Sequence, residues 1–353
     1  MRLLKFFGIV FAALALSGCS LGPLSNTGTQ GGSIWKSFDS GQTFVPKVTI
    51  DEKRKISSAD VVSFVFDPRN SDTIYIGTKA NGIFRTNDGA EHWEQLQFPP
   101  IKVYGLAIDR YNNDRLYASG VYQDIAKIYR SEDAGKNWKE IYTEPGQGTV
   151  ITALGSHPSA PDVLYAGTSA GVVIKSINGG ETWSNVFVAK GPVTKILLRK
   201  DQIEIITLLV LGHGVVFSSD GGQGWDEFAT WGFSPPGILN VQPDSIVSLL
   251  ADPARVDVLY AGAKNGLFKS EDNGKSWQAL AVIESSKKFP MHAIAVNPQN
   301  TNEIVYIAGN AFYRSLDGGI KWATTQLEIS RGVNNIEYDP VRPEVIYFVL
   351  RKF

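Results

Sequence analysis

Apolar and polar residues alternate in short runs along most of the chain, and turn residues separate these runs. Residues 61–66 form one run, Asp67-Pro68 interrupts it, and residues 73–77 form the next. The turn pair Asn81-Gly82 then leads to a third run, residues 83–85. Alternation with period two, bounded by Pro, Asn, Asp and Gly, predicts strands that are joined by tight turns.

This arrangement recurs together with a short motif, Ser/Thr-x-Asp-x-Gly-x-x-Trp, which we call the box. The third positions of the boxes are Asp39, Asp88, Asp133, Asn178, Asp220, Asp272 and Asp317. A second marker separates the first two strands of each repeat, at Asp67-Pro68, Asp109-Arg110, His157-Pro158, Arg199-Lys200, Asp252-Pro253, Asn297-Pro298 and Asp339-Pro340. A period of 42 to 52 residues with four strands per repeat predicts the blades of a β-propeller.

The two markers do not start and end together. The first box has no marker upstream of it, and the marker at Asp339-Pro340 has no box after it. Six blades are therefore continuous in the sequence, and the seventh must combine strands from residues 333–350 with the pair that flanks Asp39. We predict an all-β fold, a single seven-bladed β-propeller over residues 33–353. Its last blade is closed by strands from both chain ends, which removes the open sheet edges.

The seven boxes resemble the Asp-box (BNR) repeats of bacterial sialidases, xyloglucan-cleaving endoglucanases, the sortilin ectodomain and photosystem II assembly factors. The resemblance implies the propeller fold, which hosts several functions. An Asp that accepts backbone N–H bonds, a Gly with positive φ and a Trp between blades suit a structural turn. We therefore interpret the box residues as framework. A base precedes six boxes, and we expect rim salt bridges at these positions: Lys36, Arg85, Arg130, Lys175, Lys269 and Arg314.

The first residues predict export. Arg2 and Lys5 precede an apolar run, and residues 16–19 (Leu-Ser-Gly-Cys) resemble a bacterial lipobox. We expect residues 1–18 to be a lipoprotein signal peptide, Cys19 to be lipidated, and residues 19–32 to form a flexible tether. The predicted location is the bacterial cell membrane, to which the lipid anchors the exported protein, with the outer membrane as one option. An ordinary signal peptide with an accidental cysteine is the alternative.

Composition excludes several classes of protein. The 34 basic and 35 acidic side chains give a net charge of −1, which does not favour nucleic-acid binding. Four His residues without close spacing and a single Cys do not suit a zinc site. We expect no cofactor, no metal and a monomeric chain.

Loops that vary between repeats are the candidates for binding, and we expect them on the face opposite the boxes. They are the charged insertion with Lys53, Arg54 and Lys55, the segment with Trp231 and Phe233, the turn with Tyr122 and Asp124, and His213. Residues 121–125 are interpreted as a long turn. Trp231 is either an aromatic anchor for a partner or a lid over its own blade, and the insertion and the Tyr122 turn should share its face.

Three functions remain open. The first is a non-catalytic cell-envelope lipoprotein whose propeller face binds a protein or a glycan. The second is a sialidase-like or endoglucanase-like glycoside hydrolase, for which Asp124 with Glu144 or Asp60 would be the acid and base. The third is a scaffold similar to photosystem II assembly factors, if the source is photosynthetic.

Overall fold

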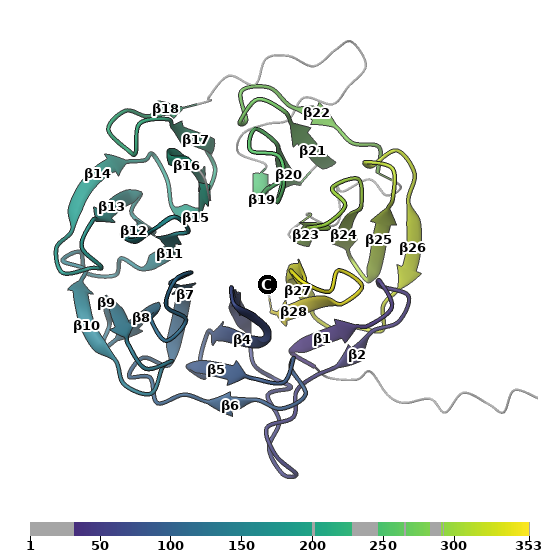
Figure 1. Ribbon diagram of the computed structural model, residues 1–353, viewed down its shortest axis with the longest axis horizontal. Coiled ribbons are helices and arrows are strands. Elements are labelled where there is room, and N and C mark those ends of the chain that lie inside the picture. The colour runs from purple at the N-terminus through teal and green to yellow at the C-terminus, as the bar shows by residue number, and fades with distance from the viewer. Residues whose placement is uncertain are drawn as a thin grey trace, which may run out of the picture.

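The computed structural model describes residues 32–199, 202–227, 246–264, 266–282, 291 and 293–352. These residues form seven four-stranded antiparallel sheets, which are arranged as blades around a central axis (Figure 1). The described residues contain strands and turns without a helix, and hence no helix that could cross a membrane. The predicted all-β, seven-bladed propeller is confirmed.

Six blades take their four strands from consecutive segments. The first contains β3 (Val61–Asp67), β4 (Asn70–Thr78), β5 (Ile83–Thr86) and β6 (Glu94–Gln95). The second contains β7 (Lys102–Ile108), β8 (Leu116–Tyr122), β9 (Ile125–Ser131) and β10 (Lys139–Thr143). The third contains β11 (Ile151–His157), β12 (Ala160–Thr168), β13 (Val172–Ser176) and β14 (Ser184–Val188). The fourth contains β15 (Val193–Arg199), β16 (Gln202–Val210), β17 (Gly214–Ser218) and β18 (Asp226–Glu227). The fifth contains β19 (Ile246–Ala251), β20 (Leu259–Ala263), β21 (Gly266–Ser270) and β22 (Gln278–Ala279). The sixth contains β23 (Ala293–Val296), β24 (Ile304–Ala308), β25 (Ala311–Ser315) and β26 (Ala323–Gln326).

The seventh blade joins the two ends of the described chain, as predicted. Its sheet order is β2-β1-β28-β27, with β1 (Ile34–Ser37), β2 (Val45–Pro46), β27 (Gly332–Tyr338) and β28 (Ile346–Arg351). Strand β1 pairs with β28 in antiparallel register, from Ile34 opposite Val349 to Ser37 opposite Ile346. This pairing closes the ring without a free sheet edge between the first and last repeats.

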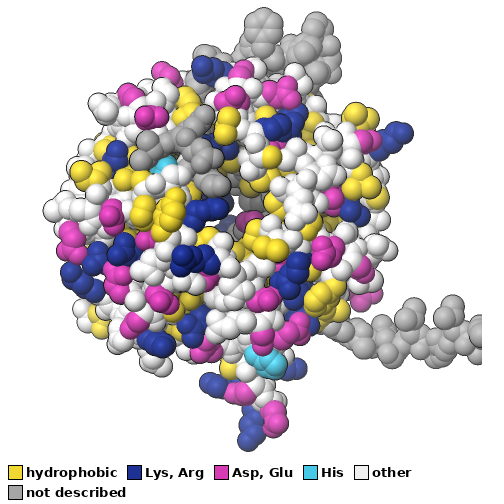
Figure 2. Space-filling view, in the orientation of Figure 1, with side chains coloured by type: hydrophobic (Ala, Val, Ile, Leu, Met, Phe, Trp, Pro, Cys, Tyr) yellow, Lys and Arg dark blue, Asp and Glu magenta, His cyan; other side chains and the backbone are white. Residues whose placement is uncertain are grey.

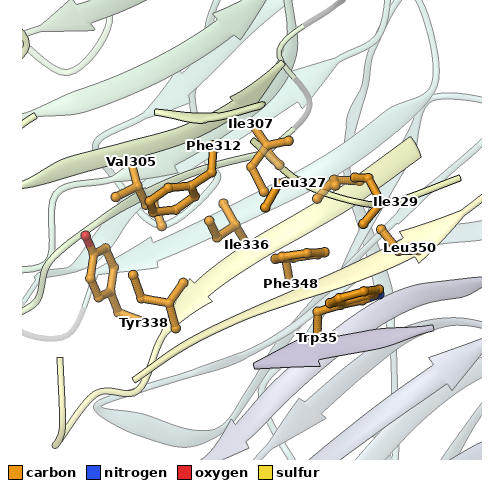
Figure 3. Packing of buried hydrophobic residues seen from close by; sticks show 14 residues of the cluster. Trp35, Val305, Ile307, Phe312, Leu327, Ile329, Ile336, Tyr338, Phe348 and Leu350 are labelled. Atoms are coloured by element: carbon orange, nitrogen blue, oxygen red, sulfur yellow. The ribbon is translucent and has the colours of Figure 1, made fainter. Parts of the chain in front are cut away.

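The core lies mostly between adjacent blades. Figure 3 shows one such cluster, in which Phe312 of β25 lies near Ile336 and Phe348 of the closing blade. Trp35 of β1 stacks on Phe348 with ring centroids 5.9 Å apart. Because each blade covers one face of its neighbour, removing a blade would expose apolar area on two others.

Candidate functional site

All seven boxes have the same hydrogen-bond pattern. The hydroxyl at the first position donates to the side-chain oxygen at the third position over 2.7 to 2.9 Å. The same side-chain oxygen accepts a backbone N–H four residues later, as Asp133 Oδ1 does from Asn137 at 2.8 Å. These bonds hold the turn between the third and fourth strands, so the box acids and Asn178 take part in the framework of each blade.

The same bonds shift the acidity of the boxes. Hydrogen bonds from the backbone and side chain of Asn137 lower the pKa of Asp133 to about 2. The pKa of Asp220 and of Asp317 is also lowered, mainly by the backbone N–H groups of Gly224 and Lys321. Burial raises the pKa of the remaining acids, but bonds within the box outweigh it and lower the pKa of Asp39, Asp88 and Asp272. A raised pKa, as a general acid requires, is found at none of these six aspartates.

The bases that precede the boxes connect one blade to the next. Lys36 Nζ donates to the carbonyl of Gly89 at 2.7 Å, and Lys175 Nζ donates to that of Gly221 at 2.8 Å. Arg85 and Arg130 make the corresponding bonds to Ala134 and Gly179. Each acceptor lies in the box of the following blade. The predicted rim salt bridges are present at Lys36, Arg85 and Arg130. The prediction was incomplete, because it missed the backbone carbonyl that all four cations bind across the blade interface.

The box Trp residues pack against the preceding blade. Trp138 meets Phe98 with ring centroids 4.8 Å apart, and Trp225 stacks on Phe187 at 4.9 Å. Trp93 is 2% exposed and lies in the cluster between the closing blade and the β3 blade. These side chains fill the gap between blades, and the box thus serves both the turn and the interface.

Antiparallel strands place successive turns on alternate sides of the ring. The boxes and the turns between the first and second strands lie on one side, which we call the box side. The turns between the second and third strands, and the connections from one blade to the next, lie on the other, which we call the loop side. Asp124 and His213 belong to turns of the loop side, and Tyr122 ends strand β8 beside the first of these turns.

Residues 121–125 are not a long turn. Strands β8 and β9 continue to the pair Tyr122–Ile125, and only Gln123 and Asp124 remain in the turn. Both have positive φ, 52° and 63°, as a tight two-residue hairpin turn requires. The expectation was wrong because strand length, and not loop length, differs in this blade. His213 is exposed in the turn between β16 and β17.

The charged insertion does not stand on the loop side. It forms a hairpin that projects outward from the rim below β6 in Figure 1. Thr49 O accepts the backbone N–H of Trp93 at 2.8 Å, and Lys47 pairs with Glu91 at 2.5 Å, so the base of the hairpin is tied to the neighbouring box. Val48 and Ile56 are buried there. This burial directs the tip outward, and the exposed Lys53, Arg54 and Lys55 do not share a face with Tyr122.

Asp60 connects the segment before β3 to both ends of the β27–β28 hairpin. Its Oδ1 accepts hydrogen bonds from Arg331 Nη2 and from the backbone N–H of Lys352, the latter at 2.8 Å. Burial alone would raise the pKa of Asp60, but these two bonds lower it. Glu144 accepts a hydrogen bond from Tyr142 at 3.1 Å and another from the N–H of Gly146. Trp231, Phe233 and Cys19 lie outside the described residues.

The loop side has an exposed apolar surface, of which only Tyr122 was predicted as a binding candidate. Ile101, Tyr122, Ile125, Val188 and Leu211 are 59%, 39%, 40%, 65% and 46% exposed. They occupy turns and strand ends of the blades that contain β7 to β17, and we call these five residues the apolar arc. The sequence signal was weak, because each blade contributes only one or two of them.

Two lysines accompany the apolar arc. Lys102 and Lys195 are exposed on the innermost strands β7 and β15, and neither has a carboxylate within 4 Å in the described part of the chain. Figure 2 shows basic and apolar side chains beside the central opening of the ring. Within the described residues no group of three or more His, Cys, Asp or Glu side chains is placed to hold a metal ion. The arrangement suits the binding of an apolar ligand with negative charge.

Comparison with known proteins places this geometry among propellers of several functions. The xyloglucanase Xgh74A of Acetivibrio thermocellus is 24% identical over 322 residues, which cover 73% of this chain and 37% of that enzyme. The photosystem II assembly lipoprotein Ycf48 of Synechococcus sp. (strain CC9902) is 24% identical over 280 residues, which cover 68% of this chain and 78% of Ycf48. The crystal structure of the Niastella koreensis GH74 enzyme superposes with a TM-score of 0.68 at 18% identity, over 83% of this chain and 51% of that one.

The chain thus spans well under two thirds of the length of the hydrolases that it resembles. Residues 111–333, more than half of the chain, match the DUF6242 beta propeller domain. The chain belongs to the family of the DUF6242 beta propeller domain.

Proposed function

We propose that the chain is a non-catalytic binding domain that holds a segment of a partner protein against its loop side. The apolar arc is the observation that supports this proposal. Five large apolar side chains are exposed on one side of neighbouring blades, although exposure of such surface to water is unfavourable by about 25 cal/mol for each Å². Exposed apolar surface of this kind is typical of interaction sites.

The charges beside the arc favour an acidic segment. Lys102 and Lys195 lack a carboxylate partner within 4 Å in the described residues. A peptide that carries both apolar and acidic side chains would bury the arc and supply the missing counter-charges. An assembly factor is among the relatives, since the protein from Synechococcus is a photosystem II assembly lipoprotein. That likeness supports a binding role, although the partner here is defined only by its chemistry.

Hydrolysis of a glycan is the second candidate, because xyloglucanases are among the relatives. A glycoside hydrolase needs two carboxyl groups that flank the scissile bond, one of them with a raised pKa. Asp60 is bound to Arg331 and Lys352, and its pKa is lowered. Asp60 therefore does not suit the role of the general acid, which weighs against catalysis at this residue.

The test changes the arc without changing the core. Ile125→Asp and Leu211→Asp place a carboxylate on the loop side, whereas Ile177→Asp places one on the box side, where Ile177 is 69% exposed. All three variants should unfold at nearly the wild-type temperature. Wild type is cross-linked to its partner in an extract of the source cells, and the partner is identified by mass spectrometry. Only the two arc variants should fail to capture this partner.

Equal loss of the partner in Ile177→Asp would refute the loop side as the binding surface. Release of reducing sugar from xyloglucan, or of sialic acid from a sialoside, by purified wild type would support the hydrolase instead.

We also propose that the protein is exported and anchored to the cell membrane through a lipid on Cys19. The basic residues Arg2 and Lys5, the apolar run that follows them up to residue 16, and the lipobox-like residues 16–19 support this location. A lipid anchor would place the propeller at the membrane surface, where a membrane-protein partner could reach its loop side.

A further inference from the structure

A cavity of about 510 Å³ opens at the end of the central channel on the box side. Turns between the first and second strands of five blades form the mouth of this cavity, which we call the channel-mouth cavity. Its wall is largely apolar and includes Phe66, Leu250, Ala295 and Tyr338. Cavities of roughly 300 to 1,000 Å³ with apolar walls and a few polar groups are typical of small-molecule sites.

Two acids, Asp67 of β3 and Glu337 of β27, and two exposed arginines, Arg69 and Arg110, also line this cavity. Glu337 stands two residues before the marker at Asp339-Pro340. In the other six repeats this position is apolar, and its residues are Val65, Ala107, Gly155, Leu197, Leu250 and Ala295. The framework of a blade therefore does not require a carboxylate there.

The carboxylate of Glu337 is only partly satisfied within the chain. Its Oε1 accepts a hydrogen bond from Asn335 Nδ2 at 2.9 Å. No Lys, Arg or His nitrogen of the described residues lies within 4 Å of it, and Lys195 on β15 acts on it only from a greater distance. Burial raises the pKa of Glu337. Glu337 is half-buried, and an unpaired carboxylate that is partly removed from water gains stability from a bound cation.

The other acids around the cavity are already occupied. Asp67 accepts hydrogen bonds from Asn113 and from the N–H of Arg69. Asp252 is paired with Arg255 at 2.6 Å, and Asp339 is paired with Arg342 at 2.7 Å. Glu337 is thus the carboxylate that remains available to a ligand inside the cavity.

We propose that the channel-mouth cavity binds an organic ammonium ion, with the ammonium group on the free oxygen of Glu337 and an apolar body against Leu250, Ala295 and Phe66. A free aliphatic amine and the side chain of a lysine share this chemistry. This site lies on the opposite side of the ring from the apolar arc, and none of its proposed ligand contacts belongs to the arc.

Titration calorimetry of the full chain tests the site. The probes are isopentylamine, its neutral analogue isopentyl alcohol, and Nα-acetyl-lysine amide. We expect the amine to bind at least about ten-fold more tightly than the alcohol, since a charge-assisted hydrogen bond is about twice as strong as a neutral one. The relative affinities of the amine and the lysine derivative identify the source of the ammonium group.

Two variants and one control decide the assignment. Glu337→Gln keeps the shape and removes the charge, so affinity for the amine should fall about ten-fold or more. Leu250→Trp keeps Glu337 and places a larger side chain where the apolar body of the ligand would lie, so it should lower the affinity as well. The control Glu328→Gln changes an exposed acid outside the cavity and should bind like wild type. Equal affinity for amine and alcohol, unchanged affinity in Glu337→Gln, or no binding of either ammonium probe at millimolar concentration would overturn the proposal.

Discussion

The guanidinium of Arg130 donates a 2.8 Å hydrogen bond from Nη1 to the carbonyl oxygen of Gly179, which lies 49 residues later in the next blade. The same guanidinium pairs with Glu132 and with Glu181, each at 3.0 Å. One side chain thus joins the third strand of its own blade to the box of the following one. Related bonds at Lys36, Arg85 and Lys175 make this connection a recurring feature of the ring.

Arg130→Met should therefore weaken the interface between two blades. Loss of a charged hydrogen bond to a backbone carbonyl costs about 1.5–3 kcal/mol, which denaturant unfolding can measure. Arg130→Lys should cost less, since Lys175 makes the same kind of bond in the next blade. Equal destabilisation by Met and Lys would show that the carbonyl bond is not the source of the effect.

Asp133→Ala should destabilise the chain, because the N–H of Asn137 and the hydroxyl of Ser131 lose their acceptor. Asp133→Asn is the matched control. Asn178 has the same position in its own box and accepts the corresponding bonds from Thr182 and Ser176. Thermal unfolding should rank the variants as wild type, Asn and then Ala, and an Ala variant as stable as wild type would contradict the framework role.

Acid should destabilise wild type through these same carboxylates. The pKa of Asp133 is lowered to about 2 in the folded state, so its contribution is present above the ordinary Asp pKa and is lost as the pH falls toward 2. The difference in stability between wild type and Asp133→Asn should shrink over that range. A difference that is independent of pH would argue against the charge of Asp133.

Trp93→Ala should cost about 3–5 kcal/mol, because a large side chain that is 2% exposed leaves a cavity between two blades. Trp93→Phe should cost much less, since Phe44 occupies this position in the first box and packs there against Phe312 and Phe348. Chemical denaturation measures both. If the two variants lose equal stability, the indole N–H bond to Lys47 O, and not the filled volume, is the important contact.

Glu337→Gln should change how stability depends on pH. Burial raises the pKa of Glu337, so the folded chain holds this proton more tightly than the unfolded chain, and stability falls as the pH rises above the ordinary Glu pKa. Asn335 and Lys195, the groups that act on the carboxylate, oppose the shift without removing it. The Gln variant should lose less stability than wild type between about pH 4 and pH 8. Parallel curves for the two proteins would mean that Glu337 is well solvated.

Cys19→Ala tests the proposed anchor. Wild type expressed in a bacterium should have a mature N-terminus at Cys19 with an attached lipid, whereas the variant should lack the lipid and keep residues 1–18. Intact-mass spectrometry of the membrane and soluble fractions measures both. A wild-type protein that is cleaved elsewhere and carries no lipid would exclude the anchor and leave the propeller assignment unaffected.

Much of the fold could be predicted because its signals are local. Alternation marks the strands, the box marks the third turn, and the offset between the first box and the marker at Asp339 predicts the shared blade that β1 and β28 form. Each signal lies within a few consecutive residues, and its repetition seven times makes it readable in one sequence.

The candidate sites could not be predicted in this way, because they join residues from different blades. The apolar arc gathers Ile101, Val188 and Leu211 only when the blades stand side by side, and the charged hairpin at Lys53 turns outward because Val48 and Ile56 are buried against the neighbouring blade. Glu337 differs from its counterparts in the sequence, but only the assembled ring of blades places it at the wall of a cavity. Periodicity within the chain determined the blades, whereas packing between blades decided which side chains face one another.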